Sequence, residues 1–318
     1  MLTAARPSTA PPPGAAPLRA EAILVNPALD RCIAALASAF VATHGAHPRM
    51  ATVFATQQRW LMAHVALAQS CEALTDPAAP DLYSSRFLKA VVSASVASRN
   101  TAHAFLQEML KYSFLQAEPD RADRRLRRLT VSETSLAGLA NWILIHLTAL
   151  DSLSEGDRVR RFRAVPDGVA RLEPGIARRL LEARKIRDPD RTFSLFTWLN
   201  QGGLVMDLMM AGLEEAPADP DRIVTGIVSA QDLAADLNVS RTNLSRKLRE
   251  AEEAGSLGWS GRRGNSALWI SSAFRREYVA YQAAKLALID AAFDEGMPAP
   301  QDGSEFRSDF GMKRRGVC

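Results

Sequence analysis

The chain has 318 residues, of which 47% are apolar, so it is long enough for two ordinary domains and apolar enough to bury a core. Arginine outnumbers lysine by 33 to 6, but the net charge is only +4, so any nucleic-acid-binding surface must be a local patch. The three cysteines, Cys32, Cys71 and Cys318, are too few and too scattered for a disulfide framework or a zinc site, and we expect single thiols in a reducing cytoplasm.

The two ends of the chain and its most apolar segment bear on localisation. Residues 1–24 are rich in proline and alanine and lack the apolar stretch of a secretory signal, so they predict a disordered tail. Residues 297–318 predict a flexible C-terminal tail. The most apolar run, Leu136–Leu150, has about fifteen residues, whereas a membrane span needs roughly 20, so it predicts a core helix. We therefore expect a soluble cytoplasmic protein that associates with the nucleoid.

Helical periodicity dominates the chain. Apolar residues at helical spacing predict helices over 27–44, 52–74, 81–93 and 98–112, and then from Ser132 or Ser135 to Leu153. After a polar stretch over 154–166, helical patterns resume over 174–185, 192–213, 230–237, 240–254 and 273–294. Only Leu129-Thr130-Val131 reads as a short strand before the long apolar helix. The sequence therefore predicts a mainly α protein.

The order of several helices followed by a short basic hairpin occurs twice. The two copies align without a gap at an offset of 142 positions between about residues 50 and 115. Identity between the copies is low, and the strongest sign of equivalence is that Ser98-Arg99 and Ser240-Arg241 begin the same kind of helix. We therefore expect two similar domains in a pseudo-twofold arrangement.

The helices that begin at these two Ser-Arg pairs have the layout of recognition helices. Each follows a short helix and a tight turn, opens with a good N-cap residue, and separates an apolar arc from a polar arc. Arginine can bind guanine bidentately, asparagine can bind adenine, and hydroxyls or histidine can reach bases and phosphates. The alternative is a solvated surface, because any amphipathic helix has a polar face. The predicted DNA-binding residues are Ser98, Arg99, Asn100, His103 and Gln107 in the first helix and Ser240, Arg241, Thr242, Ser245, Arg246 and Arg249 in the second.

An arginine-rich hairpin is expected after each of these helices. Residues 121–128 hold five arginines in eight positions, which repel one another unless an anion is present, and a duplex phosphate backbone with a narrow minor groove would supply it. The alternative is a solvated run of charges. In the second hairpin we expect Trp259 and Trp269 to anchor the loop to the core, with base stacking as the alternative. The predicted DNA-binding residues of the two hairpins are Arg121, Arg124, Arg125, Arg127, Arg262 and Arg263.

Residues 98–130 resemble the recognition helix and wing of MarR-family winged-helix regulators. The most specific part is Asp123-Arg124-Arg125, which is followed by a Leu-Thr strand end. By this resemblance, which covers roughly residues 50–153, Asp123 would brace a wing arginine, Arg125, that enters the minor groove. The flanking helices would serve dimerisation and scaffolding, and a small aromatic acid would bind between scaffold helices near Trp60, His64 and Trp142.

The second copy, over residues 239–259, resembles winged-helix proteins in general and lacks the Asp-Arg-Arg element. Members of the MarR family normally carry one winged helix per chain and dimerise, so a fused pair could imitate that dimer within a monomer. The first copy has Ser113 where such helices often end in glycine.

Signatures of catalysis and of metal binding are absent from the sequence. There is no phosphate-binding Walker loop, no HExxH zinc motif and no GxSxG nucleophile motif, and no Cys/His spacing suits zinc. We expect no enzyme activity, no cofactor and no metal. His64 and His146, on apolar helices, are expected to be satisfied core or pocket groups.

These inferences combine into one prediction. We expect two tandem winged helix-turn-helix domains, over residues 25–165 and 166–296, that bind duplex DNA at an imperfect palindrome and control transcription as a monomer or homodimer. One alternative is a plasmid-type replication initiator with tandem winged helices. The other is a winged-helix interaction module of a chromosome-associated complex, which should lack exposed arginines on its wings.

Overall fold

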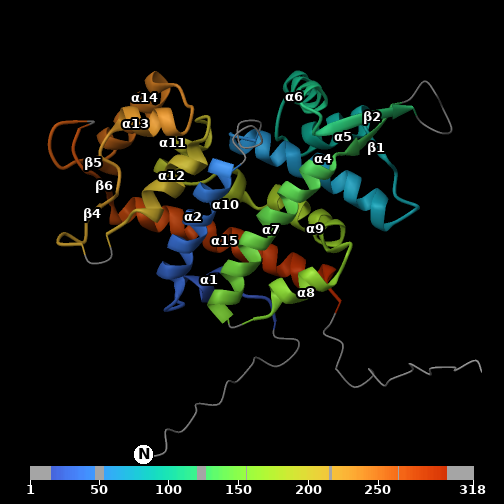
Figure 1. Ribbon diagram of the computed structural model, residues 1–318, viewed down its shortest axis with the longest axis horizontal. Helices are drawn as coiled ribbons and strands as arrows, with labels where there is room; N and C mark the ends of the chain where they lie inside the picture. Colours follow the sequence, from blue (N-terminus) through green and yellow to red (C-terminus); the bar gives the residue numbers. More distant parts are fainter. Residues whose placement is uncertain are drawn as a thin grey trace, which may run out of the picture.

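A computed structural model describes residues 16–46, 54–119, 127–154, 156–214, 217–263 and 265–298. Over these residues the chain is mainly helical with small antiparallel sheets, as the sequence predicts (Figure 1). The first half contains α1 (Ala20–Leu24), α2 (Leu29–Ala46), α4 (Gln57–Thr75), β1 (Leu82–Tyr83), α5 (Ser84–Ser93), α6 (Arg99–Lys111), β2 (Leu115–Pro119), β3 (Arg127–Val131) and α7 (Glu133–Ser154). The second half contains α8 (Arg158–Ala164), α9 (Gly168–Glu182), α10 (Arg184–Arg187), α11 (Arg191–Thr197), α12 (Gly202–Ala211), β4 (Arg222–Val224), α13 (Ala230–Asp236), α14 (Arg241–Glu253), β5 (Leu257–Trp259), β6 (Leu268–Ser271) and α15 (Ser272–Gly296).

The order strand, helix, helix, strand, strand, long helix occurs in both halves. The strand orders of the two sheets match as well, β1-β3-β2 in the first half and β4-β6-β5 in the second. Leu115 lies opposite Val131, and Leu257, which follows Leu115 by 142 positions, lies opposite Ile270. Because Val131 and Ile270 are 139 positions apart, the second hairpin is three residues shorter, and later positions correspond at this smaller offset.

Two pairs of residues with left-handed backbone shape the turns around α6 and α14. Ser113 and Gly255, which are equivalent positions, follow these helices with φ of 59° and 70°. Ser95 and Asn238 lie in the turns before them with φ of 54° and 50°. A non-glycine residue in this conformation costs roughly 1 kcal/mol or more. Ser113 therefore keeps the geometry that glycine supplies in the second half.

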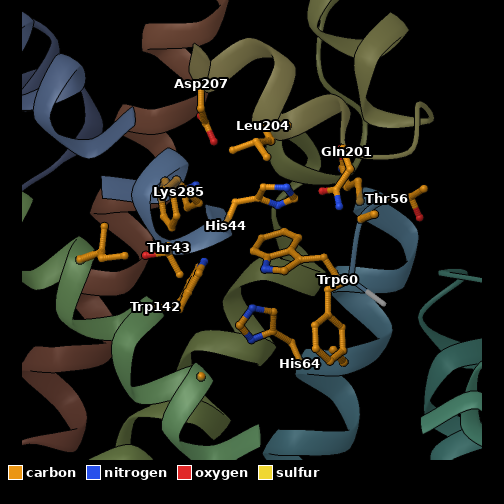
Figure 2. A pocket seen from close by; sticks show the side chains of 18 of the residues that line it. Thr43, His44, Thr56, Trp60, His64, Trp142, Gln201, Leu204, Asp207 and Lys285 are labelled. Carbon is orange, nitrogen blue, oxygen red and sulfur yellow. The ribbon is translucent and has the colours of Figure 1, made fainter. Parts of the chain in front are cut away.

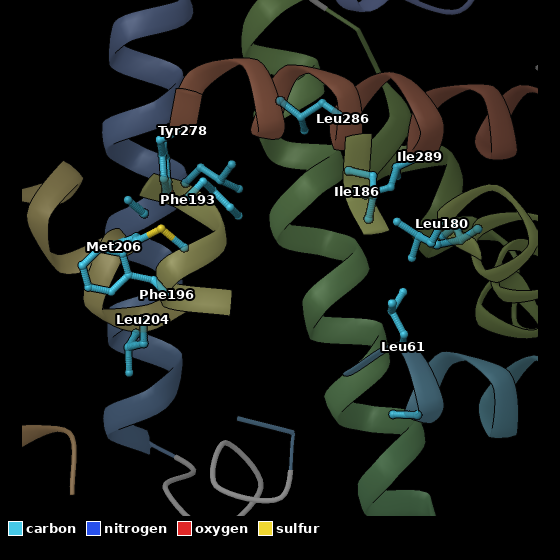
Figure 3. Close-up of a cluster of buried hydrophobic side chains, with 14 of the residues drawn as sticks. Leu61, Leu180, Ile186, Phe193, Phe196, Leu204, Met206, Tyr278, Leu286 and Ile289 are labelled. Carbon is cyan, nitrogen blue, oxygen red and sulfur yellow. The ribbon is translucent and has the colours of Figure 1, made fainter. Parts of the chain in front are cut away.

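The helices at the start of each half pack on the other half in a reciprocal way. α2 packs on α12, and α9 packs on α4. Likewise α1 packs on α15, and α8 packs on α7. Ion pairs reinforce this exchange, because the guanidinium of Arg158 in α8 donates to both carboxylate oxygens of the buried Asp290 at 2.6 and 2.9 Å and also pairs with Asp151 of α7, in the first half, at 3.4 Å. The two halves therefore share one core, part of which is shown in Figure 3.

Helix α7 is longer than the apolar run seen in the sequence. It has 22 residues and is long and apolar enough, by length and composition alone, to cross a membrane. In this fold it packs against α2, α8, α9 and α15, and Ile143, Leu147 and Leu150 are fully buried. The helix thus occupies the place predicted for it in the core.

Several predicted boundaries differ from the structure. The disordered tail predicted for residues 1–24 is too long, because α1 lies within it and buries Ile23. The helix predicted over 81–93 begins with β1, since Leu82 and Tyr83 pair with β3. The stretch over 154–166, interpreted as polar connection, contains α8. The helix predicted from Pro174 begins earlier, at Gly168, and carries the proline inside it.

The helix predicted over 192–213 is broken into α11 and α12. Gln201 at the break has a φ of 60°, and its backbone N–H donates to the carbonyl of Ala55 in the first half. A Cβ atom on Gly202 would lie 1.7 Å from the carbonyl oxygen of Phe196, so a larger residue could not be accommodated there. This close approach sets the angle between α11 and α12.

Candidate nucleic-acid interface and central cavity

Helices α6 and α14 lie on the same side of the molecule, away from α1 and α8, and the two sheets lie at the outer ends (Figure 1). Their N-termini are capped in the same way. The Ser98 hydroxyl accepts a hydrogen bond from the N–H of Thr101, and the Ser240 hydroxyl accepts one from the N–H of Asn243. The apolar arc of each helix is buried, which turns the polar arc outward.

The predicted contact residues of the two helices are available at the surface, with one exception. Ser245 is half-buried. The exposed residues are Ser98, Arg99, Asn100, His103, Gln107, Ser240, Arg241, Thr242, Arg246 and Arg249. On each helix, the side chains that helical periodicity places on one polar arc are thus exposed together, apart from the half-buried Ser245.

Three arginines on or near these helices form ion pairs with acidic residues of the same chain. Arg246 pairs with Glu250 at 3.2 Å, Arg263 pairs with Glu252, and Arg128 pairs with Glu118 at 2.7 Å. The sequence prediction of Arg246 and Arg263 as DNA-binding cations did not anticipate these ion pairs. Exposed pairs of this kind contribute only about 0–1 kcal/mol, so a phosphate can replace the acidic partner at small cost.

The hairpins are described only in part. Arg121, Asp123, Arg124 and Arg125 lie outside the described residues, so the bracing of Arg125 by Asp123 stays a prediction. Arg127 and Arg262 are exposed.

The two tryptophans of the second hairpin have a structural role, as predicted. Trp259 packs against the core. The Trp269 ring lies against Gly258, where a Cβ atom would come within 2.4 Å of it, and the Arg222 guanidinium lies 5.1 Å from its centre. These contacts hold the base of the hairpin in place.

A cavity of about 330 Å³ lies between the two halves (Figure 2). Trp60, His64 and Trp142, the residues predicted to lie near a pocket, all line it. The sequence did not reveal the other wall, which comes from α12 and α15 and includes Asp207 and Lys285. No local pattern indicates that these helices line the same cavity as α4, because their position depends on the reciprocal packing of the two halves.

The wall formed by α4 and α7 is aromatic. The rings of Trp60 and Trp142 lie 6.0 Å apart, and the His64 ring packs edge-on at 4.9 and 5.0 Å from them. His64 Nδ1 lies 2.7 Å from Oε1 of Glu173 in α9, and both side chains are buried. His146 Nδ1 lies 2.8 Å from the carbonyl oxygen of Trp142. His64 is thus paired within the core through Nδ1, as predicted, whereas Nε2 of the fully buried His146 has no hydrogen-bond partner among the described residues.

The opposite wall carries two charged groups of opposite sign. Asp207 accepts a hydrogen bond from the Tyr278 hydroxyl, and burial raises the pKa of Asp207 to about 6. Burial lowers the pKa of Lys285 to about 8. The Lys285 ammonium lies 5.4 Å from the Phe40 ring centre and 5.8 Å from that of Tyr281. Among the described residues no direct ion pair joins Lys285 to Asp207.

Four residues that line the cavity have buried polar atoms with no hydrogen-bond partner within the described part of the protein. These atoms are Nε2 of Gln201, Oε1 of Gln282, Oε1 of Gln57 and Nδ1 of His44. An unpaired buried polar group costs about 1–3 kcal/mol. The cavity therefore offers both donors and acceptors to a polar occupant.

Asp207 makes stability depend on pH. Its folded-state pKa of about 6 lies above the ordinary 3.8, so the folded protein binds more protons than the unfolded chain between these values. Raising the pH from 4 to 7 should therefore remove stability, by up to about 3 kcal/mol. Asp207→Asn should remove this loss, so the stability of the variant relative to the wild type should rise between about pH 4 and about pH 6 and level off above that range. Urea unfolding of both proteins at several pH values measures the difference, and a difference independent of pH would contradict the assignment.

Other reactive groups are few in the part of the chain that the structure covers. Cys32 and Cys71 are buried free thiols, in agreement with the sequence prediction, whereas Cys318 lies outside that part. Burial raises the pKa of Cys71 and keeps this thiol protonated. No group of His, Cys, Asp or Glu residues suited to a metal ion occurs among the described residues.

The geometry thus provides a pair of equivalent polar helices on one side of the molecule and a partly polar cavity between the halves. Comparison with known proteins adds no family assignment: the chain matches no protein-family model, no curated protein and no solved structure.

Proposed function

We propose that the protein is a sequence-specific duplex-DNA-binding regulator of transcription, without catalytic activity, built from two tandem winged helix-turn-helix units related by a pseudo-twofold axis. The repeated element order and the matching strand orders of the two sheets support this fold. In such units the second helix of the pair enters the major groove and the hairpin contacts the backbone or minor groove. Binding of this kind would place the protein at the nucleoid.

One observation carries the proposal. Arg99 and Arg241 occupy equivalent positions at the exposed N-terminal ends of α6 and α14, which face the same side of the molecule. The N-terminal residues of a recognition helix are those that meet base edges, and arginine to guanine is the commonest specific contact. If the two helices were only solvated surfaces, nothing would favour an arginine at the same capped position in both.

The proposal includes a monomer that covers both half-sites. In a dimeric regulator of this type the half-site centres lie about one helical turn apart, roughly 34–36 Å. Here the two recognition helices are similar but not identical, since Asn100 corresponds to Thr242 and His103 to Ser245. We therefore expect half-sites that agree at the position read by arginine and differ at others.

Making the two helices alike tests this expectation. The triple variant Thr242→Asn, Ser245→His and Arg249→Gln gives α14 the polar residues that α6 has at the equivalent positions. Selection from a random duplex library should return an imperfect palindrome for the wild type and a more symmetric site for the triple variant. Sedimentation of the wild-type complex should show one chain per site.

The outcomes separate the proposal from its alternatives. A symmetric site for the wild type, or two chains on a site of this length, would exclude a pseudo-dimer. A replication initiator would select the same kind of site but occupy several repeats of it near an origin. A protein-interaction module would select no duplex at all.

A further inference from the structure

The central cavity lies where equivalent parts of the two halves face each other. At the offset that holds after the hairpins, Trp142 and His146 of α7 correspond to Tyr281 and Lys285 of α15. His146 is not among the residues that line the cavity, so at these positions one half supplies an indole, and the other supplies a phenol and an ammonium group. An occupant of this cavity meets an aromatic wall on one side and a polar wall on the other, as Figure 2 shows for Trp60 and Trp142 opposite Asp207.

The aromatic wall selects for a flat ring system. Trp60 and Trp142 of this wall line the cavity and are only partly buried by the protein, and the same is true of Tyr281 on the opposite wall. Ring faces of this kind favour stacking or edge-on contact with another aromatic group, worth about 0.5–1.5 kcal/mol beyond the buried area. The volume of about 330 Å³ lies at the lower end of the range for small-molecule sites, which suits a one- or two-ring molecule.

The polar wall selects against a net charge. An anion drawn to Lys285 would also lie near Asp207, and a cation drawn to Asp207 would lie near Lys285. The unpaired amide atoms point to the same conclusion, because Gln201 offers a donor and Gln282 an acceptor. These two side chains are only 5% and 3% exposed, so water outside the cavity cannot satisfy them.

We propose that the cavity binds a small flat aromatic molecule that has no net charge and carries both a hydrogen-bond donor and an acceptor at its polar end, and that this ligand regulates DNA binding. The regulatory part rests on the function proposed above.

The cavity is lined by one recognition helix, α6, and by α11, which packs on the other recognition helix, α14. Met109 belongs to α6 itself, lines the cavity from the buried side of that helix and is 1% exposed. On the other side Phe193 and Thr197 of α11 line the cavity, and α11 packs on α14. Because packed cores move between discrete arrangements, a ligand that fills this space changes how α6 and α14 are placed relative to each other.

Four probes that share one ring system test the ligand class on the full chain without DNA. Indole-3-acetamide is neutral with a donor and an acceptor, indole-3-acetate is an anion, tryptamine is a cation, and indole lacks the polar end. Isothermal titration calorimetry should show the amide binding at least about tenfold more tightly than the other three. Strongest binding of either charged probe, or no binding of the amide at millimolar concentration, would overturn the proposal.

Two variants test whether the charged pair sets this preference. Asp207→Asn keeps an acceptor for Tyr278 and should shift the preference toward indole-3-acetate, whereas Lys285→Met should shift it toward tryptamine. An unchanged order of affinities in both variants, with circular dichroism showing that they are folded, would exclude this wall as the binding site.

The regulatory part is measured separately, by fluorescence anisotropy of labelled DNA with and without saturating amide. A change of at least about fivefold in DNA affinity is expected, the lower limit typical of coupling between two sites. Amide binding without this change would overturn regulation while leaving the site in place. Amide binding by a protein that binds no DNA would overturn the proposed function alone.

Discussion

Raising the salt concentration from about 50 to about 200 mM is expected to weaken binding to duplex DNA about a thousandfold. Eight arginines can contribute phosphate contacts. Five are exposed and have no ion pair within the described residues: Arg99, Arg127, Arg241, Arg249 and Arg262. The other three, Arg121, Arg124 and Arg125, lie between β2 and β3 in the sequence, outside the described residues. If six of the eight contact phosphates, release of counterions gives a log–log slope of roughly −5.

Fluorescence anisotropy over a salt series measures this slope. The control is Arg160→Ala, which removes a side chain that is 80% exposed on α8, on the far side of the molecule from α6 and α14 (Figure 1). This variant should keep the slope, whereas Arg262→Ala should reduce its magnitude by about 1. A response that is flat with salt would mean that these arginines do not lie along a phosphate backbone.

Replacing Arg241 with alanine is expected to weaken specific binding by about 1–3 kcal/mol and to relax the preference at one base pair. The same result is expected for Arg99, in the other half-site. The reason is the position of these residues at the capped N-terminal ends of α14 and α6, where side chains reach base edges. The double variant should lose affinity by the sum of the two effects, because the two helices are separate parts of the surface.

Selection of binding sites by each variant separates base contacts from backbone contacts. Arg262→Ala, on the hairpin, should lower affinity and leave the selected sequence unchanged, since hairpin contacts go mainly to the backbone. Arg124 and Arg125 are expected to behave like Arg262. An unchanged site for Arg241→Ala would mean that α14 does not lie in the major groove.

Much of the fold follows from local pattern. The offset of 142 positions that relates the two copies in the sequence places Leu115 and Leu257 at equivalent points of the two sheets. The bounds of α6 and α14 were predicted to within one or two residues, because each helix has a strong serine cap and a clean apolar arc. Trp60, His64 and Trp142 were correctly associated with a cavity, although only through a family resemblance.

What the sequence did not predict depends on contacts between distant segments. The break between α11 and α12 is set by the approach of Gly202 to Phe196 and by the bond from Gln201 to Ala55. The polar wall of the cavity exists only because α12 and α15 are brought against the first half. The partner of Arg263 is Glu252 on α14, which the sequence of the hairpin does not indicate. The pair of Arg246 and Glu250 is an exception, because it joins residues four positions apart on one helix and local spacing could have indicated it.

The exchange of α1 and α2 for α8 and α9 between the halves makes the chain a single cooperative unit. A cut in the connection between α7 and α8 would leave a first fragment that keeps α4 but lacks its cover α9, and a second that keeps α12 but lacks its cover α2. Neither fragment contains a complete core, so each would expose apolar surface until the two reassociate. The two halves are thus not independent folding units. The chain has to be synthesised to the end of α15 before the core of either half is fully covered.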